Sequence, residues 1–177
     1  MRRLFALIPL AALAVLAVFF WNGLGRDPRE VPSVLINRPV PEFQLAGPPG
    51  QSSGLSSADL KGRVSLVSLF GSWCVSCLQE HPTLMMIRQG GELPIFGLDW
   101  RDDPVKGAEW LARNGNPYEK IGLDPAPGRV SIDFGVTGAP ESFLVDRNGV
   151  IRYKQIGPIT PEIWQHTLLP IVRELQK

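Results

Sequence analysis

Apolar and polar positions divide the chain into an N-terminal apolar run and a longer part in which short apolar runs alternate with amphipathic stretches. The first run, residues 4–21, contains no charged residue and no Asn, Gln, Ser or Thr. As a helix it would reach roughly 27 Å, which is just enough to cross the hydrocarbon core of a bilayer. We therefore expect one N-terminal transmembrane helix over residues 4–21.

The flanks of this run favour an uncleaved anchor, residues 1–21, over a cleaved signal peptide. Ala12-Leu13-Ala14 has the small-residue pattern of a cleavage site but lies inside the run, whereas Trp21 closes it with a residue suited to the membrane interface. Arg2 and Arg3 favour a cytoplasmic N-terminus. The rest of the chain is then expected in an oxidising compartment, the periplasm of a bacterium, on a single-pass inner-membrane anchor.

Residues 22–41 carry four prolines and three arginines with little periodicity and are expected to be a linker. In the remaining domain, residues 42–177, the apolar runs 64–70 and 93–100 predict buried central strands. The other expected elements are helices over 74–89 (interrupted at Pro82), 105–114, 131–134 and 161–176, and strands over 118–123, 142–145 and 150–156. Crossover helices imply parallel pairs and the 146–149 turn implies an antiparallel pair, so the pattern predicts an α/β fold with a central mixed sheet flanked by helices.

Composition narrows the function classes. A net charge of +1 argues against a nucleic-acid surface. Two cysteines are too few for a disulfide scaffold, and a bond across two residues adds little stability. A zinc site would need further ligands, and the only histidines are His81 and His166. Two buried structural cysteines are the remaining plain alternative to a reactive pair.

Cys74 and Cys77 follow a buried strand and open a helix, and this position suggests chemistry. Free N–H groups at a helix N-terminus stabilise a thiolate, so Cys74 is expected to be the exposed attacking sulfur. Cys77 lies one turn later on the same helix face and could resolve a mixed disulfide on Cys74. The pair therefore predicts thiol–disulfide exchange.

Trp73-Cys-x-x-Cys77, with Pro82 five residues later, resembles the active-site helix of thioredoxin-like proteins. The stretch Gly-Val-Thr-Gly-Ala-Pro-Glu-Ser-Phe at 135–143 resembles the loop of that fold that carries a cis-proline. This resemblance implies that Pro140 is cis and packs against the disulfide, although an X–Pro bond is far more often trans. It also implies that Trp73 shields the disulfide.

The chain is most similar to the DsbE/CcmG-type thiol:disulfide interchange proteins of cytochrome c maturation. The resemblance is carried by Gly97-Leu98-Asp99, Asp102-Asp103, the Gly-Asn-Pro-Tyr at 115–118 and residues 135–146. It implies a dithiol kept reduced by a membrane dithiol electron-transfer protein, which reduces apocytochrome c or its assembly partner before haem attachment. No cofactor and no metal are implied. Val75-Ser76 departs from the Pro-Thr or Pro-Pro that is usual in the family, which leaves the reduction potential open.

The acids near the pair have two interpretations each. Glu80 occupies the position of the family's active-site acid, but composition alone favours a solvated surface residue. Glu141 could shape an acidic groove for the client, and Asp99 could be a buried proton acceptor or a turn residue. His81 is expected on the surface, His166 in a structural role, and Trp100, Trp110 and Trp164 in packing.

Two other functions compete with the reductase. One is a dithiol oxidase of the DsbA kind, a family that prefers Pro-His between its cysteines and is usually soluble. The other is a non-catalytic module that binds apocytochrome or copper. Copper-delivery relatives usually have three residues between their cysteines, whereas this chain has two. The expected anchor and the Gly-Ala-Pro-Glu loop at 138–141 favour the reductase.

Overall fold

The computed structural model describes residues 7–24, 35–50 and 53–177. The chain divides into two units, residues 1–32 and 33–177, which are described separately. In the first unit, α2 (Leu7–Leu24) is helical. Among the described residues, no helix has both the length and the apolar character needed to cross a membrane. The transmembrane helix expected over 4–21 is therefore not confirmed, and Arg2, Arg3, residues 4–6 and residues 25–34 lie outside the described part of the chain.

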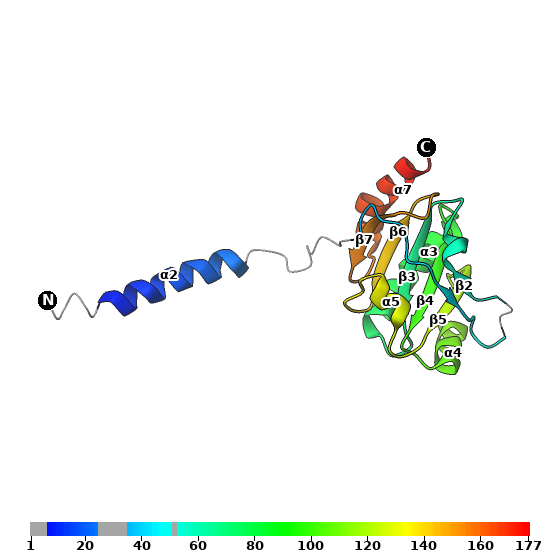
Figure 1. Ribbon diagram of the computed structural model, residues 1–177, viewed down its shortest axis with the longest axis horizontal. Coiled ribbons are helices and arrows are strands. Elements are labelled where there is room, and N and C mark those ends of the chain that lie inside the picture. The colour runs from blue at the N-terminus through cyan, green and yellow to red at the C-terminus, as the bar shows by residue number, and fades with distance from the viewer. Residues whose placement is uncertain (1–6, 25–34, 51–52) are drawn as a thin grey trace. The chain divides into compact units, whose positions relative to one another are not determined.

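The second unit is built on a five-stranded mixed sheet in the order β5-β4-β3-β6-β7 (Figure 1). The central strand β3 pairs in parallel with β4, which pairs in parallel with β5. On its other side, β3 pairs with β6 in antiparallel fashion, as β6 does with β7. The strands are β3 (Ser65–Phe70), β4 (Ile95–Trp100), β5 (Lys120–Asp124), β6 (Glu141–Val145) and β7 (Ile151–Ile156). The predicted mixed sheet is confirmed.

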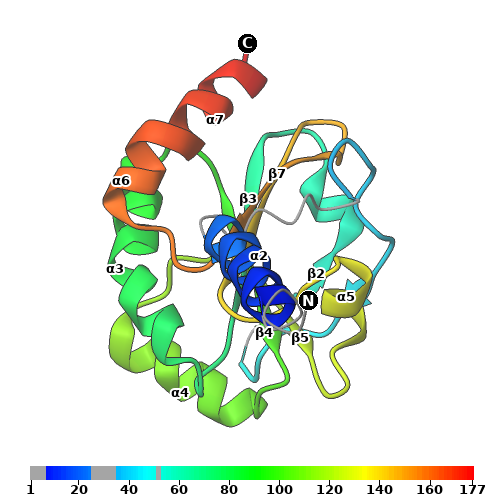
Figure 2. The ribbon, with the colours of Figure 1, turned by 90° about the vertical axis from the view of Figure 1, so that its left-hand side faces the viewer.

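Other elements pack on both faces of this sheet (Figure 2), and an apolar layer fills the space on each face. Alternate residues of a strand point to opposite faces. On β3, Leu66 and Phe70 therefore join the core beneath the long helices, whereas Val67 and Leu69 join the other core. The first face carries α3 (Val75–Gly90), α4 (Pro104–Asn114) and the C-terminal helix; the second carries β1 (Gln44–Leu45), β2 (Leu55–Ser56), the 3₁₀ helix η1 (Ser57–Leu60) and α5 (Arg129–Asp133).

Helix α3 continues through Pro82, so the predicted interruption is wrong. A proline removes one backbone donor, which costs one hydrogen bond to the preceding turn. The residues that follow Pro82 are held by the core, because Leu84 and Ile87 are fully buried. Packing on both sides of the proline therefore keeps the helix in one piece.

The C-terminal helix begins as predicted but is not regular. The side chain of Thr160 accepts a hydrogen bond from the N–H of Ile163 at 3.2 Å, and Pro161 takes the first helical position. The chain then runs through α6 (Pro161–Ile163), the π-helical segment η2 (Trp164–Leu168) and α7 (Leu169–Leu175). Pro170 has no N–H and crowds the turn before it, and a widened turn accommodates that loss.

The predicted hairpin between β6 and β7 is confirmed. The carboxylate of Asp146 accepts hydrogen bonds from the N–H groups of Asn148 and Val150, at 2.8 and 3.0 Å. Gly149 has a φ of +76°, which favours glycine. The turn chemistry that the sequence indicated therefore forms.

Part of the predicted linker belongs to the folded unit. The N–H of Asn37 donates to the carbonyl of Ile151, and the N–H of Val40 donates to that of Gly149, both at 2.8 Å. Pro39 bridges Val150, and Val40 is buried. Residues 37–40 thus lie along the start of β7, inside the range 22–41 that was expected to be a linker.

Candidate functional site

The site is centred on a disulfide between Cys74 and Cys77, at the point where β3 passes into α3. Cys74 is the N-cap of α3, and its Sγ accepts a hydrogen bond from the N–H of Cys77 at 3.1 Å. Cys77 lies on the buried side of the helix beneath the carbonyl of Leu69. One free N–H group of the first helical turn, that of Cys77, therefore faces the sulfur of Cys74, in agreement with the predicted position of Cys74 at the helix N-terminus.

The disulfide is less accessible than expected. Cys74 is 5% exposed and Cys77 1% exposed, so the prediction of an exposed Cys74 is wrong for the oxidised protein, although Cys74 is the more accessible of the two. Apolar side chains around the pair are open to solvent: Trp73 is 50% exposed, Val75 75% and Leu78 48%. These exposed apolar side chains therefore lie close to the sulfur atoms in sequence.

The loop before Cys74 is held by the end of β4. The N–H and the hydroxyl of Ser72 both donate to the carboxylate of Asp102, the hydroxyl at 2.8 Å. The indole N–H of Trp73 donates to the carbonyl of Trp100 at 3.2 Å, and the two indoles lie 5.7 Å apart. A Cβ on Gly71 would come within 2.6 Å of the Trp73 indole nitrogen, so only glycine leaves room for this arrangement.

Pro140 is preceded by a cis peptide bond, as the resemblance implied. It is buried, and its carbonyl accepts the N–H of Gly157 at 3.0 Å. Ala139 packs against the core cluster that contains both cysteines. The Ala126–Pro127 bond is also cis, and no feature of the sequence pattern indicated it.

Glu80 lies one turn beyond Cys77 and is buried, not solvated. One oxygen accepts the N–H of Ile159 at 2.9 Å, and the other lies 3.5 Å from the hydroxyl of Ser68. Burial raises the pKa of Glu80 to about 7, although these two hydrogen bonds act in the opposite direction. A carboxyl with that pKa can both give and take a proton near neutral pH.

Asp99 is a second buried acid on the same face of the sheet, at the end of β4. Burial, followed by the negative charge of Asp102, raises the pKa of Asp99 to about 8. A Cβ on Gly107 of α4 would lie only 2.3 Å from the Oδ2 of Asp99. Asp99 is therefore a buried acid and not a simple turn residue.

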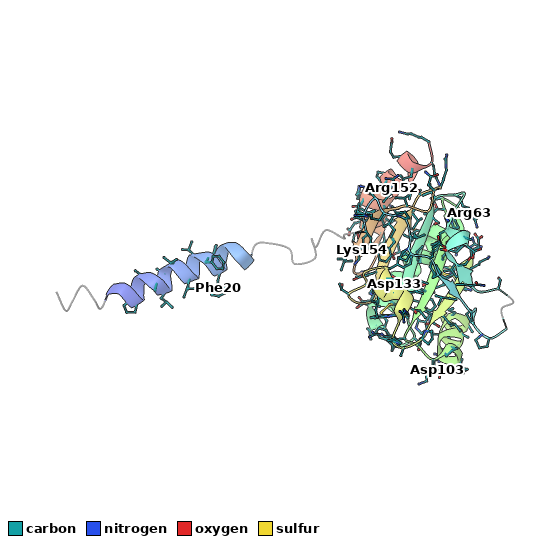
Figure 3. The ribbon with its side chains drawn as sticks, in the orientation of Figure 1. Phe20, Arg63, Asp103, Asp133, Arg152 and Lys154 are labelled. Carbon is teal, nitrogen blue, oxygen red and sulfur yellow. A yellow bond between two sulfur atoms is a disulfide. The ribbon has the colours of Figure 1, made fainter. Side chains whose placement is uncertain are left out.

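Glu141 does not shape an acidic groove, so that prediction is wrong. It is 1% exposed, and the N–H of Thr137 donates to it at 3.1 Å. Its carboxylate forms an ion pair at 2.9 Å with Lys154 of β7, which is labelled in Figure 3. Strand alternation places Glu141 with Phe143 on the face opposite α3. Glu141 therefore supports the β6–β7 pair and does not contact the disulfide.

The histidines and the remaining tryptophans take no part in the site. His81 is buried, not on the surface as expected: its Nε2 lies 3.1 Å from the carbonyl of Gly115, and its ring meets Trp110 edge-on. Burial lowers the pKa of His81, although the neighbouring carbonyls raise it. His166 is exposed on η2. Trp110 and Trp164 pack in the core, one of the two packing positions expected for them.

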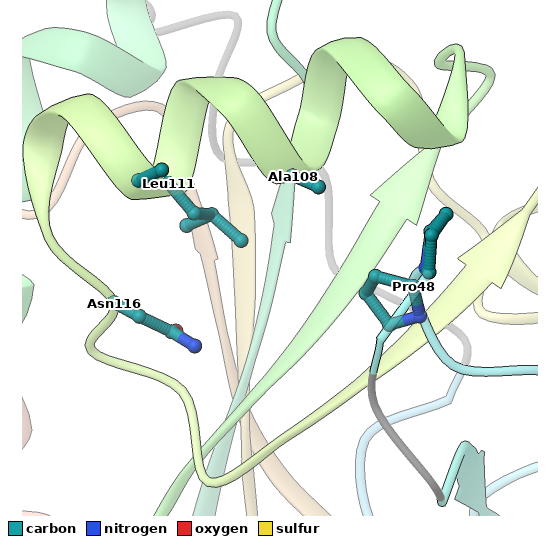
Figure 4. Close-up of a pocket in the computed structure, with 6 residues that line it drawn as sticks. Pro48, Ala108, Leu111 and Asn116 are labelled. Carbon is teal, nitrogen blue, oxygen red and sulfur yellow. The ribbon is translucent and has the colours of Figure 1, made fainter.

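A hollow of about 280 Å³ lies elsewhere, between α4 and the Pro48–Pro49 turn (Figure 4). Its walls are Pro48, Pro49, Ala108, Leu111, Ala112 and Asn116, none of which belongs to the disulfide site.

Within the residues that the structure describes, no group of three or more His, Cys, Asp or Glu side chains is placed to hold a metal ion.

Comparison with known proteins places this geometry in a family. The redoxin family matches residues 36–167. The thiol:disulfide interchange protein DsbE of Pseudomonas aeruginosa is 39% identical over 99% of this chain and 96% of its own length. DsbE of Allochromatium vinosum is 42% identical over 97% and 94%, and DsbE of Escherichia coli K12 is 37% identical over 100% and 98%. The thioredoxin domain of a thiol-disulfide oxidoreductase from Bacteroides vulgatus superposes with a TM-score of 0.66 at 21% identity, covering 79% of this chain and 99% of that domain.

The chain belongs to the DsbE-type thiol:disulfide interchange proteins of the redoxin family.

A DsbE-type protein is a thiol-disulfide oxidoreductase, and the Cys74–Cys77 pair is the group in this chain that can exchange electrons with thiol partners. The structure gives two residues a role at the site that the sequence alone did not assign to them. Ser68 contacts both Glu80 and the buried Tyr118, and Asp102 holds Ser72. Ser68 could have been found from the sequence, because it is a polar residue inside the apolar run of β3 and therefore needs a buried polar partner. The contact of Asp102 with Ser72 joins residues 30 positions apart and left no local signal.

Proposed function

We propose that this DsbE-type protein is a periplasmic, membrane-tethered dithiol reductase that reduces disulfides in apocytochrome c, or in a thiol protein of its assembly, before haem attachment. Support for the client and the direction comes from the motifs quoted above, which resemble those of cytochrome c maturation proteins. Support for the chemistry comes from Cys74 as the N-cap of α3, its sulfur receiving the N–H of Cys77. This last contact is the observation that carries the proposal.

In the proposed cycle, the Cys74 thiolate attacks one sulfur of the client disulfide. A Cys74–client disulfide forms, and the first client sulfur leaves as a thiolate that takes up a proton. The Cys77 thiolate then attacks the sulfur of Cys74 and the second client thiolate leaves and is protonated. The client has gained two electrons and two protons, and the protein has become the disulfide seen here. A membrane dithiol electron-transfer protein would return it to the dithiol.

Glu80 is the group proposed to move the proton in the resolving step. It lies three residues from Cys77 on the buried face of α3, and its pKa is raised to about 7. A carboxylate there can accept the proton of the Cys77 thiol before Cys77 attacks. Pro140 and Trp73 are proposed to frame the disulfide for the client, whereas Glu141 is left without a catalytic role.

The proposed tether rests on the uncharged run 4–21 and on Arg2 and Arg3 before it. Fractionation of cells that express the full chain, followed by protease treatment of spheroplasts, tests this placement. A membrane-bound domain that external protease digests is the expected result. A domain that stays soluble after cell lysis would contradict the tether without affecting the thiol chemistry.

A Cys77→Ser variant of the full chain tests the reaction itself. It is expected to accumulate a mixed disulfide through Cys74 that reductant dissolves, and mass spectrometry would identify the client. Cys74→Ser is the matched control and should trap no such complex. A Cys77→Ser variant that captures no thiol protein would contradict exchange chemistry and favour a binding module.

The direction of electron flow needs a separate measurement. Acid quenching of intact cells, followed by thiol alkylation, reports the redox state of the Cys74–Cys77 pair. A largely reduced pair supports the reductase. A largely oxidised pair would overturn it in favour of a dithiol oxidase.

A further inference from the structure

Trp100, the last residue of β4, and Asp102, two residues later, both contact the loop that presents Cys74. Phe70 is the register partner of Asp99, so the residues after each strand continue side by side. Trp100 accepts the indole N–H of Trp73. Asp102 accepts the N–H and the hydroxyl of Ser72, which stands two residues before Cys74. The conformation of the cysteine loop thus depends on the position of the Asp102 carboxylate.

Asp99 is the buried neighbour of that carboxylate. It is 2% exposed, and among the described residues no donor reaches its Oδ1. The carboxyls of Asp99 and Asp102 lie within hydrogen-bonding reach of each other, and two carboxyl groups can bond only when one of them carries a proton. Asp102 already accepts the donors of Ser72 and the N–H of Asp103, so the proton belongs on the buried Asp99.

We propose that Asp99 is a positioning residue for the thiol chemistry. Its protonated carboxyl donates to Asp102 and holds it in the orientation in which Asp102 binds Ser72. When Asp99 loses its proton, two carboxylates face each other, the support of Ser72 weakens, and attack at the disulfide slows. This role concerns the protein's own loop, so it holds whichever client the protein serves and whichever way electrons flow.

The surroundings of Asp99 favour its protonated form over its ionised form. The charged groups that act on it from the β4–α4 loop are Asp102 and Asp103, both negative. Tyr118, which precedes β5, is buried, and its pKa lies well above the usual range because of burial and then the charge of Glu80. Helix α4 faces Asp99 with Gly107, which brings no charge. Among these groups none is a cation, so an ionised Asp99 gains no compensating charge from them.

The oxidised full-length protein offers a test free of thiol titration. The amide signal of Ser72 and the indole signal of Trp73 are followed by NMR between pH 5 and pH 10, together with the carboxyl carbon of Asp99. We expect the Ser72 amide to shift with the same midpoint as the Asp99 carboxyl. A Ser72 signal that does not follow Asp99 would overturn the proposal, and this needs no variant.

A second measurement links the proton to the chemistry. The rate at which dithiothreitol reduces the disulfide is compared between the natural chain and Asp99→Asn at each pH, so that the ionisation of the reagent cancels. The amide can still donate to Asp102 but cannot ionise. We expect equal rates below pH 7 and about a threefold slower natural chain at pH 9, because an ionised Asp99 no longer holds Asp102 in the orientation that binds Ser72.

Asp103→Asn is the matched control. It removes a charge from the same loop, and asparagine can still cap α4, where Asp103 accepts the N–H groups of Val105 and Lys106. In the Asp103→Asn background, the same comparison is made between the single variant and the Asp103→Asn, Asp99→Asn double variant. The double variant should again be reduced faster than the single variant at pH 9 but not at pH 7. A rate ratio for Asp99→Asn that stays flat across this range would refute the positioning role, even if the protein proved to be an active reductase.

Discussion

The main-chain N–H of Cys77 points at the sulfur of Cys74, at 3.1 Å. The two residues are therefore unequal even before the disulfide opens. On reduction, a thiolate at Cys74 would keep this donor, whereas Cys77 would remain on the buried side of α3. The relationship assigns attack to Cys74 and resolution to Cys77.

This asymmetry predicts the order of alkylation. In the reduced protein at pH 7, a sub-stoichiometric amount of iodoacetamide should label Cys74 at least about tenfold faster than Cys77, because a stabilised and more accessible thiolate reacts first. Peptide mass spectrometry gives the ratio. The same reaction in urea is the control and should label both equally. Preferential labelling of Cys77 in the folded protein would reverse the assignment.

Glu80 predicts a pH dependence of stability. Burial raises its pKa from 4.5 to about 7 in the folded protein, so the folded state binds this proton more tightly than the unfolded chain. The part of the unfolding free energy that depends on this proton is therefore fully present below about pH 4.5. It is lost as the pH rises to about 7, by a total of about 3 kcal/mol. Urea denaturation of the oxidised Glu80→Gln variant should lack this decline. Glu109→Gln, at an exposed site on α4, should retain it.

Gly107 predicts a steric limit on α4. Replacing a helical glycine by alanine normally stabilises a helix by about 0.5–1 kcal/mol. Here the new Cβ would stand 2.3 Å from the Asp99 carboxylate, so Gly107→Ala should instead destabilise the protein by about 1–3 kcal/mol. Urea denaturation measures the difference. Gly138→Ala, where a Cβ meets nothing within 4 Å, is the control, and Asp99→Ala should relieve the cost of Gly107→Ala in the double variant.

The Glu141–Lys154 pair predicts a loss of stability without a loss of thiol reactivity. Lys154→Met leaves a carboxylate buried without its cation and should cost about 3–5 kcal/mol. Lys177→Met, at the exposed pair with Glu174, should change stability by less than about 0.5 kcal/mol. Alkylation of Cys74 should stay within about twofold of the natural rate in both variants. If the rate of Cys74 alkylation fell strongly in Lys154→Met alone, Glu141 would have a role in the thiol chemistry after all.

The sequence predicted those features that depend on neighbouring residues. The Asp146 turn and the Thr160 cap are made by contacts two to four residues long. The buried side of α3 was not predicted, although Cys77, Glu80, Leu84 and Ile87 follow helical spacing and all are buried. That spacing places Glu80 inside, against the compositional preference for the surface.

Other features depend on segments that are distant in sequence. Glu141 and Ser142 alternate along β6, and nothing local tells which of them faces α3. The partner of Glu141, Lys154, lies across the hairpin, and the Ile159 N–H that binds Glu80 is 79 residues away. Such contacts exist only once the sheet has formed, so composition and periodicity carry no record of them.

The chain segment that precedes β3 reaches both outer strands of the sheet. Residues 37–40 are bonded to the start of β7, and the carbonyl of Ala46 accepts the N–H of Leu123 on β5 at 2.8 Å. An outer strand with free backbone groups is a template on which a second chain can add and aggregate. This segment occupies part of both templates, and its Val40, Leu55 and Leu60 cover one apolar face. A soluble fragment designed to begin at β3 would expose the edges of β5 and β7 and this apolar face. A fragment that does not aggregate therefore has to begin before residue 35.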